Sequence, residues 1–194
     1  MPAGRLSDAV ARGARAAELN PLDPATRSVA AWAYLAAGMT AEGLAAARRA
    51  FELDSASAFA RPTLALAELK SGMRAEALVT VRTSVRTPLN SGLIGYVLGA
   101  TGDRAAATLL LAQLERERAV NWAVNRAMML TWLGLGDTDG ALASLERGVR
   151  EHEPLNLTLL SFADPMFDPI RSSPRFVAVL RSYGIDEHSL VYRR

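Results

Sequence analysis

The chain has 194 residues, of which half are hydrophobic and 22% are charged, and it contains no cysteine. A chain of this length can bury a core in one domain, or at most two. The lack of cysteine excludes disulfide scaffolds, zinc ribbons and cysteine nucleophiles. Twenty-two basic residues against 20 acidic ones give a formal net charge of only +2. Such a balanced charge argues against a nucleic-acid-binding surface.

Neither an export signal nor a membrane-spanning segment is visible in the sequence. Residues 1–20 carry Arg5, Arg12 and Arg15 and contain no unbroken apolar run of the kind found in signal peptides. The longest nearly apolar run, residues 29–39, is much shorter than the roughly 18 to 20 residues that a spanning helix needs. We therefore expect a cytoplasmic protein that makes no contact with a membrane.

A repeat dominates the first three quarters of the chain. Glycines 38, 72, 102 and 136 recur at intervals of 34, 30 and 34 residues, each between two stretches rich in alanine and leucine. Glycine just past a helix supplies the left-handed backbone conformation that ends it. A small residue follows each glycine by five positions, at Gly43, Ala77, Ala107 and Ala141. A small side chain there allows two helices to approach closely. The pattern predicts helix, tight turn and helix, four times over.

This array resembles the tetratricopeptide repeat (TPR) family, whose unit of about 34 residues is an antiparallel helix pair. The small and aromatic residues of the first helix match at Ala31 with Tyr34 and, more loosely, at Met129 with Trp132. The resemblance covers about residues 5–152. It implies an all-α fold, an antiparallel helix-pair right-handed α-solenoid with a C-terminal capping helix segment.

The expected domain boundaries follow from the repeat. A repeat array at 1–153 divides into a half repeat at 1–22 and units at 23–57, 58–87, 88–118 and 119–153. Capping helices are expected at 154–185, and a flexible tail at 186–194. In the short third unit the first helix is expected at about residues 90–100, and its three glycines would make that unit the most yielding. Pro62 requires that the preceding unit's first helix begin near it.

The amino-terminal half repeat has no first helix to pack against. Ala9, Val10, Ala14 and Ala17 would then form an uncovered apolar edge, although solenoid ends normally need a polar cap. A homodimer through this helix, or a fusion to an upstream domain, would cover that edge.

The tail has a pattern of its own. Residues 154–162 are apolar and helix-like, and residues 164–176 read DPMFDPIRSSPRF, in which Ser173 and Pro174 begin a helix that Gly184 ends. This pattern looks like the closing segment of repeat arrays in bacterial multidomain signalling proteins. In those proteins a Ser/Thr kinase, a nucleotide cyclase or a winged-helix regulator domain precedes the repeats.

No constellation of residues suggests catalysis or a cofactor. The loop containing Asp137 and Asp139 has Gly148 where a calcium loop needs its final glutamate, so we interpret Asp137 as a helix cap. His152 and His188 offer no triad. Asp164 and Asp168 each precede proline, which favours turn and cap roles. We expect no catalytic, cofactor-binding or metal-binding residue.

The TPR resemblance implies that a peptide or protein partner lies along the first helices of the units, on the concave face. When the units are aligned with the family's repeat, the residues expected to be exposed on this face are Ser28, Val29, Trp32, Ala36, Phe59, Thr63, Leu66, Lys70, Tyr96, Arg126 and Leu130. Trp32, Phe59 and Tyr96 are either large anchors for a partner or packing residues between repeats. The chain's own tail, through Phe162, Met166, Phe167 or Phe176, is a further candidate to fill this face or to cap the last repeat.

The sequence thus predicts a non-catalytic protein–protein interaction scaffold that binds a peptide or partner segment. The alternative is the C-terminal regulatory portion of a signalling enzyme or regulator whose catalytic or DNA-binding domain is not in this chain.

Overall fold

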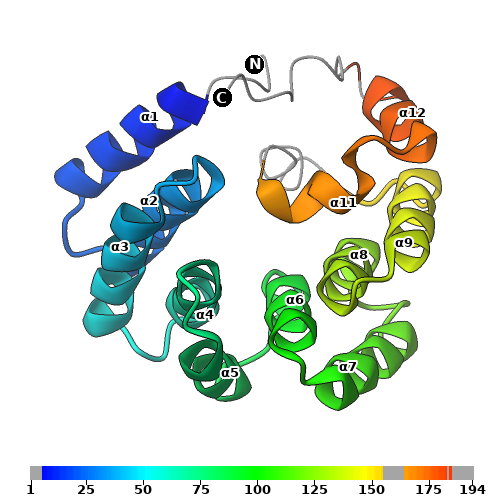
Figure 1. Ribbon diagram of the computed structural model, residues 1–194, viewed down its shortest axis with the longest axis horizontal. Helices are drawn as coiled ribbons and strands as arrows, with labels where there is room; N and C mark the ends of the chain where they lie inside the picture. Colours follow the sequence, from blue (N-terminus) through cyan, green and yellow to red (C-terminus); the bar gives the residue numbers. More distant parts are fainter. Residues whose placement is uncertain (1–5, 155–163, 183, 185–194) are drawn as a thin grey trace.

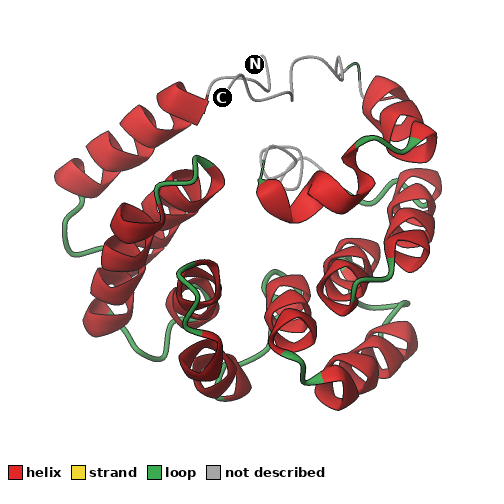
Figure 2. Ribbon diagram, viewed as in Figure 1, coloured by secondary structure: helices red, strands yellow, loops and turns green. Residues whose placement is uncertain are grey.

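The computed structural model describes residues 6–154, 164–182 and 184, and every regular element among them is a helix (Figure 2). The prediction of an all-α protein is therefore confirmed for the described chain. In order, the helices are α1 (Leu6–Leu19), α2 (Pro24–Ala36), α3 (Thr40–Leu53), α4 (Ala60–Lys70), α5 (Arg74–Arg82), α6 (Ser91–Thr101), α7 (Arg104–Arg116), α8 (Val124–Leu135), α9 (Thr138–Arg150), the 3-10 turn η1 (Pro165–Phe167), α11 (Asp168–Arg171) and α12 (Pro174–Ser182). Among these residues, no helix is long and apolar enough to cross a membrane.

The four repeated glycines end helices as predicted. Gly38, Gly72, Gly102 and Gly136 have φ angles of 75°, 82°, 97° and 77°, a conformation that costs a residue with a Cβ free energy. After each glycine, the next backbone N–H donates to the carbonyl five residues earlier at 2.9 Å, as Met39 does to Tyr34. This hydrogen bond satisfies a carbonyl that the end of the helix leaves without a partner.

Each predicted unit contains one pair of consecutive helices. Units 23–57, 58–87, 88–118 and 119–153 enclose α2 with α3, α4 with α5, α6 with α7, and α8 with α9. The first helix of the third unit begins at Ser91, close to its expected start. Pro62 lies in the first turn of α4, where a proline is tolerated. Residues 155–163 and 185–194 of the tail lie outside the described residues. The candidate contact through Phe162, most of the apolar stretch at 154–162 and the whole predicted flexible end at 186–194 therefore lie outside them as well.

The helices follow one another around an arc (Figure 1). The first helices of the pairs, α2, α4, α6 and α8, lie on its inner side and pack against one another in that order. The second helices, α3, α5, α7 and α9, lie on its outer side, and α1 and α12 stand at the two ends. A single hydrophobic core runs between the two layers and continues into η1, α11 and α12. We call the side of α2, α4, α6 and α8 that is turned to the inside of the arc the inner face.

Glycines bring α6 and α8 into close contact, which is the most extensive contact between two helices in the part of the chain that the structure describes. A Cβ on Gly92 would lie 2.9 Å from the Cα of Ala127, and one on Gly99 would lie 2.6 Å from the carbonyl carbon of Gly134. The intrinsic cost of glycine in a helix is thus offset by contacts that a larger residue would prevent. The glycines that suggested a yielding unit form a tight helix crossing.

Among the described residues, the amino-terminal helix packs mainly against α2. Gly13 of α1 is buried against Ala30 of α2, where a Cβ would lie 3.1 Å from the Ala30 Cα. Of the residues expected along an uncovered edge, Ala9 is exposed, whereas Val10, Ala14 and Ala17 are half-buried. Dimerisation through this helix stays a prediction.

Candidate functional site

An ion pair links the middle of the inner face to the tail. Lys70, the only lysine in the chain, lies at the end of α4, and its Nζ donates to Asp164 Oδ1 at 2.6 Å and to Oδ2 at 2.7 Å. Its third hydrogen bond goes to the carbonyl oxygen of Leu35 in α2 at 3.4 Å. Only 15% of the Lys70 side chain and 2% of the Asp164 side chain remain exposed. Burial of two charges is tolerated here because each charge is compensated by the other. Replacement of either side chain by a neutral one would leave an uncompensated buried charge.

The segment that follows Asp164 lies along the inner side of the arc (Figure 1). Asp164 begins η1 by accepting a hydrogen bond from the Met166 N–H at 2.8 Å, so one carboxylate serves both as cap and as ion-pair partner. Met166, Phe167 and Ile170 are buried, whereas Pro165 and Asp168 are exposed. The segment therefore buries a carboxylate and three apolar side chains and exposes Pro165, Asp168 and Pro169.

Tyr96 of α6 lies close to the same carboxylate. Burial of the phenol, and then the negative charge of Asp164, raise the pKa of Tyr96 to about 12. Lys70 and Tyr96 thus lie close to one carboxylate, and the Leu35 carbonyl accepts the remaining hydrogen bond of Lys70, so three successive inner helices contribute to the arrangement. We call these three groups the Lys70 site.

The last helix covers the end of the array. Phe176 and Leu180 of α12 are buried, and α12 packs against α9. Arg175 donates from Nε and a terminal nitrogen to Glu146 at 2.7 and 2.8 Å, and it also pairs with Asp139 at 3.3 Å. The hydrogen bond from Arg175 lowers the pKa of Glu146. The tail thus takes part in both of the arrangements that the sequence left open: Asp164 binds Lys70 on the inner face, and α11 and α12 pack against α9 at the end of the array.

Five of the residues expected to be exposed on the concave face are buried, so for them that prediction is wrong. Ser28, Ala36, Thr63, Leu66 and Leu130 keep 7% or less of their surface. The reason is the close packing of successive inner helices, as when Trp32 Nε1 of α2 donates to Thr63 Oγ1 of α4 at 3.3 Å. These side chains hold the inner helices together and are not free for a partner.

The other predicted residues differ in how accessible they are. Val29 is 64% exposed and Phe59 45% exposed, whereas Trp32 is half-buried. Lys70 and Tyr96 are engaged with the tail. Arg126 is half-buried, donates to the Leu89 carbonyl at 2.7 Å, and has a pKa lowered by desolvation.

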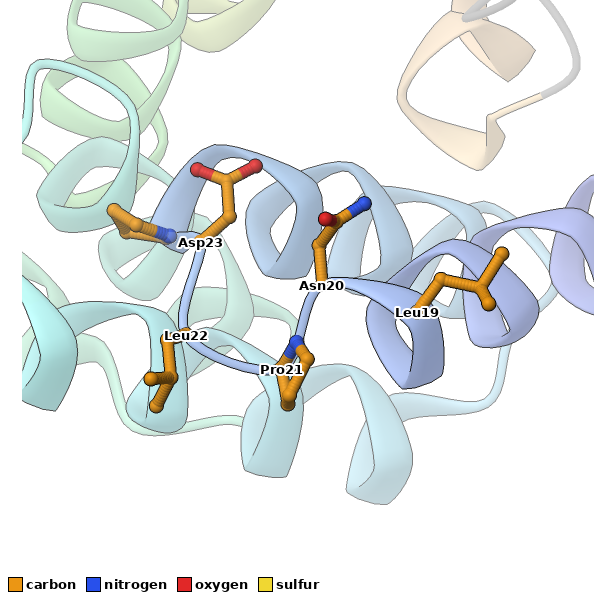
Figure 3. A pocket seen from close by; sticks show the side chains of 6 residues that line it. Leu19, Asn20, Pro21, Leu22 and Asp23 are labelled. Carbon is orange, nitrogen blue, oxygen red and sulfur yellow. The ribbon is translucent and has the colours of Figure 1, made fainter.

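The sequence analysis did not predict that large apolar side chains are exposed in the turns between the units. The turns before α2, α4, α6 and α8 each carry at least one exposed large apolar side chain: Leu19, Leu22, Phe59, Val85, Val120 and Trp122. Figure 3 shows the first of these turns, where Leu19 and Leu22 project away from one another beside Pro21 and line a shallow hollow. The signal in the sequence was a large apolar residue in each inter-unit turn, where polar residues are usual.

The acidic loop behaves as a cap. Asp137 precedes α9 and accepts from the Gly140 N–H at 2.7 Å, as the sequence predicted. Within the described residues, no group of three or more His, Asp or Glu side chains is placed to hold a metal ion.

Comparisons of the chain with protein-family models, with curated proteins and with solved structures gave no match.

Proposed function

We propose that the protein is a non-catalytic interaction scaffold whose helix pairs form a TPR-like, right-handed α-solenoid, and whose inner face binds a peptide segment of a protein partner. The support for the solenoid is the regular order of contacts, in which each inner helix packs on the next one and on its outer partner. The same surface would serve whether the chain acts alone or as the regulatory part of a larger protein.

The observation that carries the proposal is that the inner face already holds an extra segment of polypeptide. Residues 164–171 lie there with a carboxylate on Lys70 and with Met166, Phe167 and Ile170 buried. A surface that binds a peptide in this way combines what peptide recognition needs: apolar burial for affinity and one buried polar contact for orientation.

Photo-crosslinking from single positions tests the proposal. Val29 on the inner helix α2 and Val79 on the outer helix α5 are matched, since they are 64% and 68% exposed. Benzoylphenylalanine is placed at each position in turn in the protein's own cells, and the crosslinked products are identified by mass spectrometry.

We expect a discrete protein adduct from position 29 that is absent from position 79. A Trp32→Ala substitution, which removes an aromatic side chain of the same helix, should reduce the yield of that adduct. The same adducts from both positions, or none from position 29, would contradict binding at the inner face.

A further inference from the structure

The Lys70 site has a geometry that fits one kind of ligand group. The Lys70 ammonium has three N–H donors, of which two meet the two oxygens of one carboxylate and the third meets the Leu35 carbonyl. A carboxylate is the group that accepts from such a cation at both oxygens without an unsatisfied donor remaining. The site therefore selects an acidic side chain.

The residues after the carboxylate define the rest of the ligand. The apolar side chains two, three and six positions after Asp164, those of Met166, Phe167 and Ile170, are buried. The residues between them, Pro165, Asp168 and Pro169, are exposed. Complementarity to the inner face thus requires an acidic residue followed by apolar residues at these spacings. The intervening positions are free to vary.

The segment and the cap are held in part by different contacts. Helix α12 packs on α9, and Arg175 pairs with Glu146 and Asp139. The contacts of Asp164 with Lys70 belong only to the segment. Helix α11 also packs against α9 and α12, so release of residues 164–171 would uncover part of the cap while the ion pairs of Arg175 remain.

We propose that the Lys70 site is the specificity determinant for a protein partner, which presents an acidic residue followed by apolar residues at the spacing of residues 164–170, and that the chain's own segment occupies this site until the partner displaces it. This inference rests on the proposed function, because it names the class of peptide that the inner face binds. The chain's own segment is a competitor at an effective concentration on the order of millimolar, so the partner must bind more tightly than that segment.

The test uses the full chain and two synthetic peptides with blocked ends. One peptide has the sequence of residues 164–171 and a fluorescent label, and the other differs only by Asn in place of its first Asp. Binding is measured by fluorescence anisotropy to the wild-type chain, to Asp164→Asn, and to Lys70→Gln combined with Asp164→Asn. Circular dichroism and light scattering report helicity and mass for each variant.

Asp164→Asn weakens the internal competitor, so we expect this variant to bind the acidic peptide at least tenfold more tightly than the wild-type chain does. It should also prefer the acidic peptide to the Asn peptide at least tenfold, and the added Lys70→Gln should abolish that preference. Equal binding of both peptides to Asp164→Asn, or no binding, would overturn the inference. A dimer of Asp164→Asn would overturn it too, because the site would then belong to a second copy.

A chain in which the two charges are exchanged provides a second test if Asp164→Asn fails to fold. Lys70→Asp combined with Asp164→Lys restores the ion pair with reversed polarity. Its own segment still competes, as it does in the wild-type chain. We therefore expect this chain to bind a peptide with Lys at the first position at least tenfold more tightly than the acidic peptide, and a preference for the acidic peptide would overturn the inference. If a Val29 crosslink captures a partner while these peptides fail, the proposed function stands and only the inference about Lys70 falls.

Discussion

Gly95 of α6 lies directly against Thr131 of α8, so that a Cβ on the glycine would overlap the threonine side chain. Thr131 is fully buried, and its hydroxyl donates to the Ala127 carbonyl at 2.8 Å, which fixes the side chain in place. This contact belongs to the closest helix crossing of the inner layer. Tyr96, part of the Lys70 site, belongs to the same crossing, since a Cβ on Gly134 of α8 would overlap the Tyr96 carbonyl oxygen.

Gly95→Ala tests this crossing. Alanine has a helix propensity about 1 kcal/mol better than glycine, but the overlap with Thr131 has the opposite effect. Overpacking of a buried contact typically costs about 1 to 3 kcal/mol, and we expect a net loss of this size in the free energy of unfolding. Chemical denaturation measures it. The double variant with Thr131→Ala should recover part of the loss, and a Gly95→Ala chain as stable as wild type would contradict the crossing.

Ala77→Leu tests the register of the helix pairs. Ala77 is fully buried in α5, whereas Ala75 in the same helix is exposed. We expect Ala77→Leu to lower the free energy of unfolding by about 1 to 3 kcal/mol, because the larger side chain must force α4 and α5 apart. Ala75→Leu is the matched control and should leave the stability close to that of wild type. Equal effects of the two substitutions would show that the register is wrong.

Glu68 is a buried carboxyl whose replacement should stabilise the protein at neutral pH. Its Oε2 has no hydrogen-bond partner among the described residues, and desolvation raises its pKa. A carboxyl whose pKa is raised on folding lowers stability once the pH exceeds the pKa of the unfolded chain. We therefore expect Glu68→Gln to increase the free energy of unfolding at pH 7 by roughly 1 kcal/mol.

The gain from Glu68→Gln should disappear at low pH, where Glu68 itself is protonated in both states. Denaturation at pH 7 and at low pH measures both values. Glu42→Gln, at an exposed position of α3, is the control and should change little. A loss of stability in Glu68→Gln at pH 7 would mean that the carboxylate is favourably paired.

The raised pKa of Tyr96 predicts how the free energy of unfolding changes at high pH. Its pKa is about 12 in the folded chain, against about 10 for an unperturbed tyrosine. Between these two values the unfolded chain releases the phenol proton and the folded chain keeps it, so stability falls as the pH rises. A two-unit difference corresponds to roughly 2 to 3 kcal/mol at most.

The comparison of wild type with Tyr96→Phe isolates this effect. The difference between their absorbance titrations near 295 nm should show one tyrosine that ionises at about pH 12. The free energy of unfolding of wild type, relative to that of the variant, should fall between about pH 10 and pH 12. A Tyr96 that ionises near pH 10 would show that its phenol is not buried.

The sequence predicted the helix pairs well because their signals are local. Glycine turns, small residues at fixed spacing and the Ser173–Pro174 helix start depend on a few neighbouring residues, and the structure has each of them where it was expected. The glycines of α6 were interpreted from helix propensity alone. Their role depends on α8, about 35 residues further along the chain, which no local pattern reveals.

The candidate site could be predicted only in part for the same reason. The repeat register indicates which positions lie on the first helices, but it does not show how tightly those helices pack, so Thr63 and Leu66 were taken for exposed residues. The partner of Lys70 lies 94 residues away in sequence. Asp164 was correctly interpreted as a cap, and nothing in its neighbourhood indicates that the same carboxylate also pairs with α4.

The most direct test of the account is the distance between the tail and α4 in solution. The chain has no cysteine, so spin labels on Ser71→Cys and Ser172→Cys, both exposed positions, report this distance alone by pulsed electron paramagnetic resonance. Ser71 adjoins Lys70, and Ser172 follows α11. Labels on Ser71→Cys and Thr108→Cys, within the repeats, provide the control.

We predict one narrow distance distribution for the tail pair, which broadens when Asp164→Asn removes the ion pair, while the control pair stays narrow in both chains. A tail distribution that is equally broad with and without Asp164 would contradict a segment held on the inner face by Lys70.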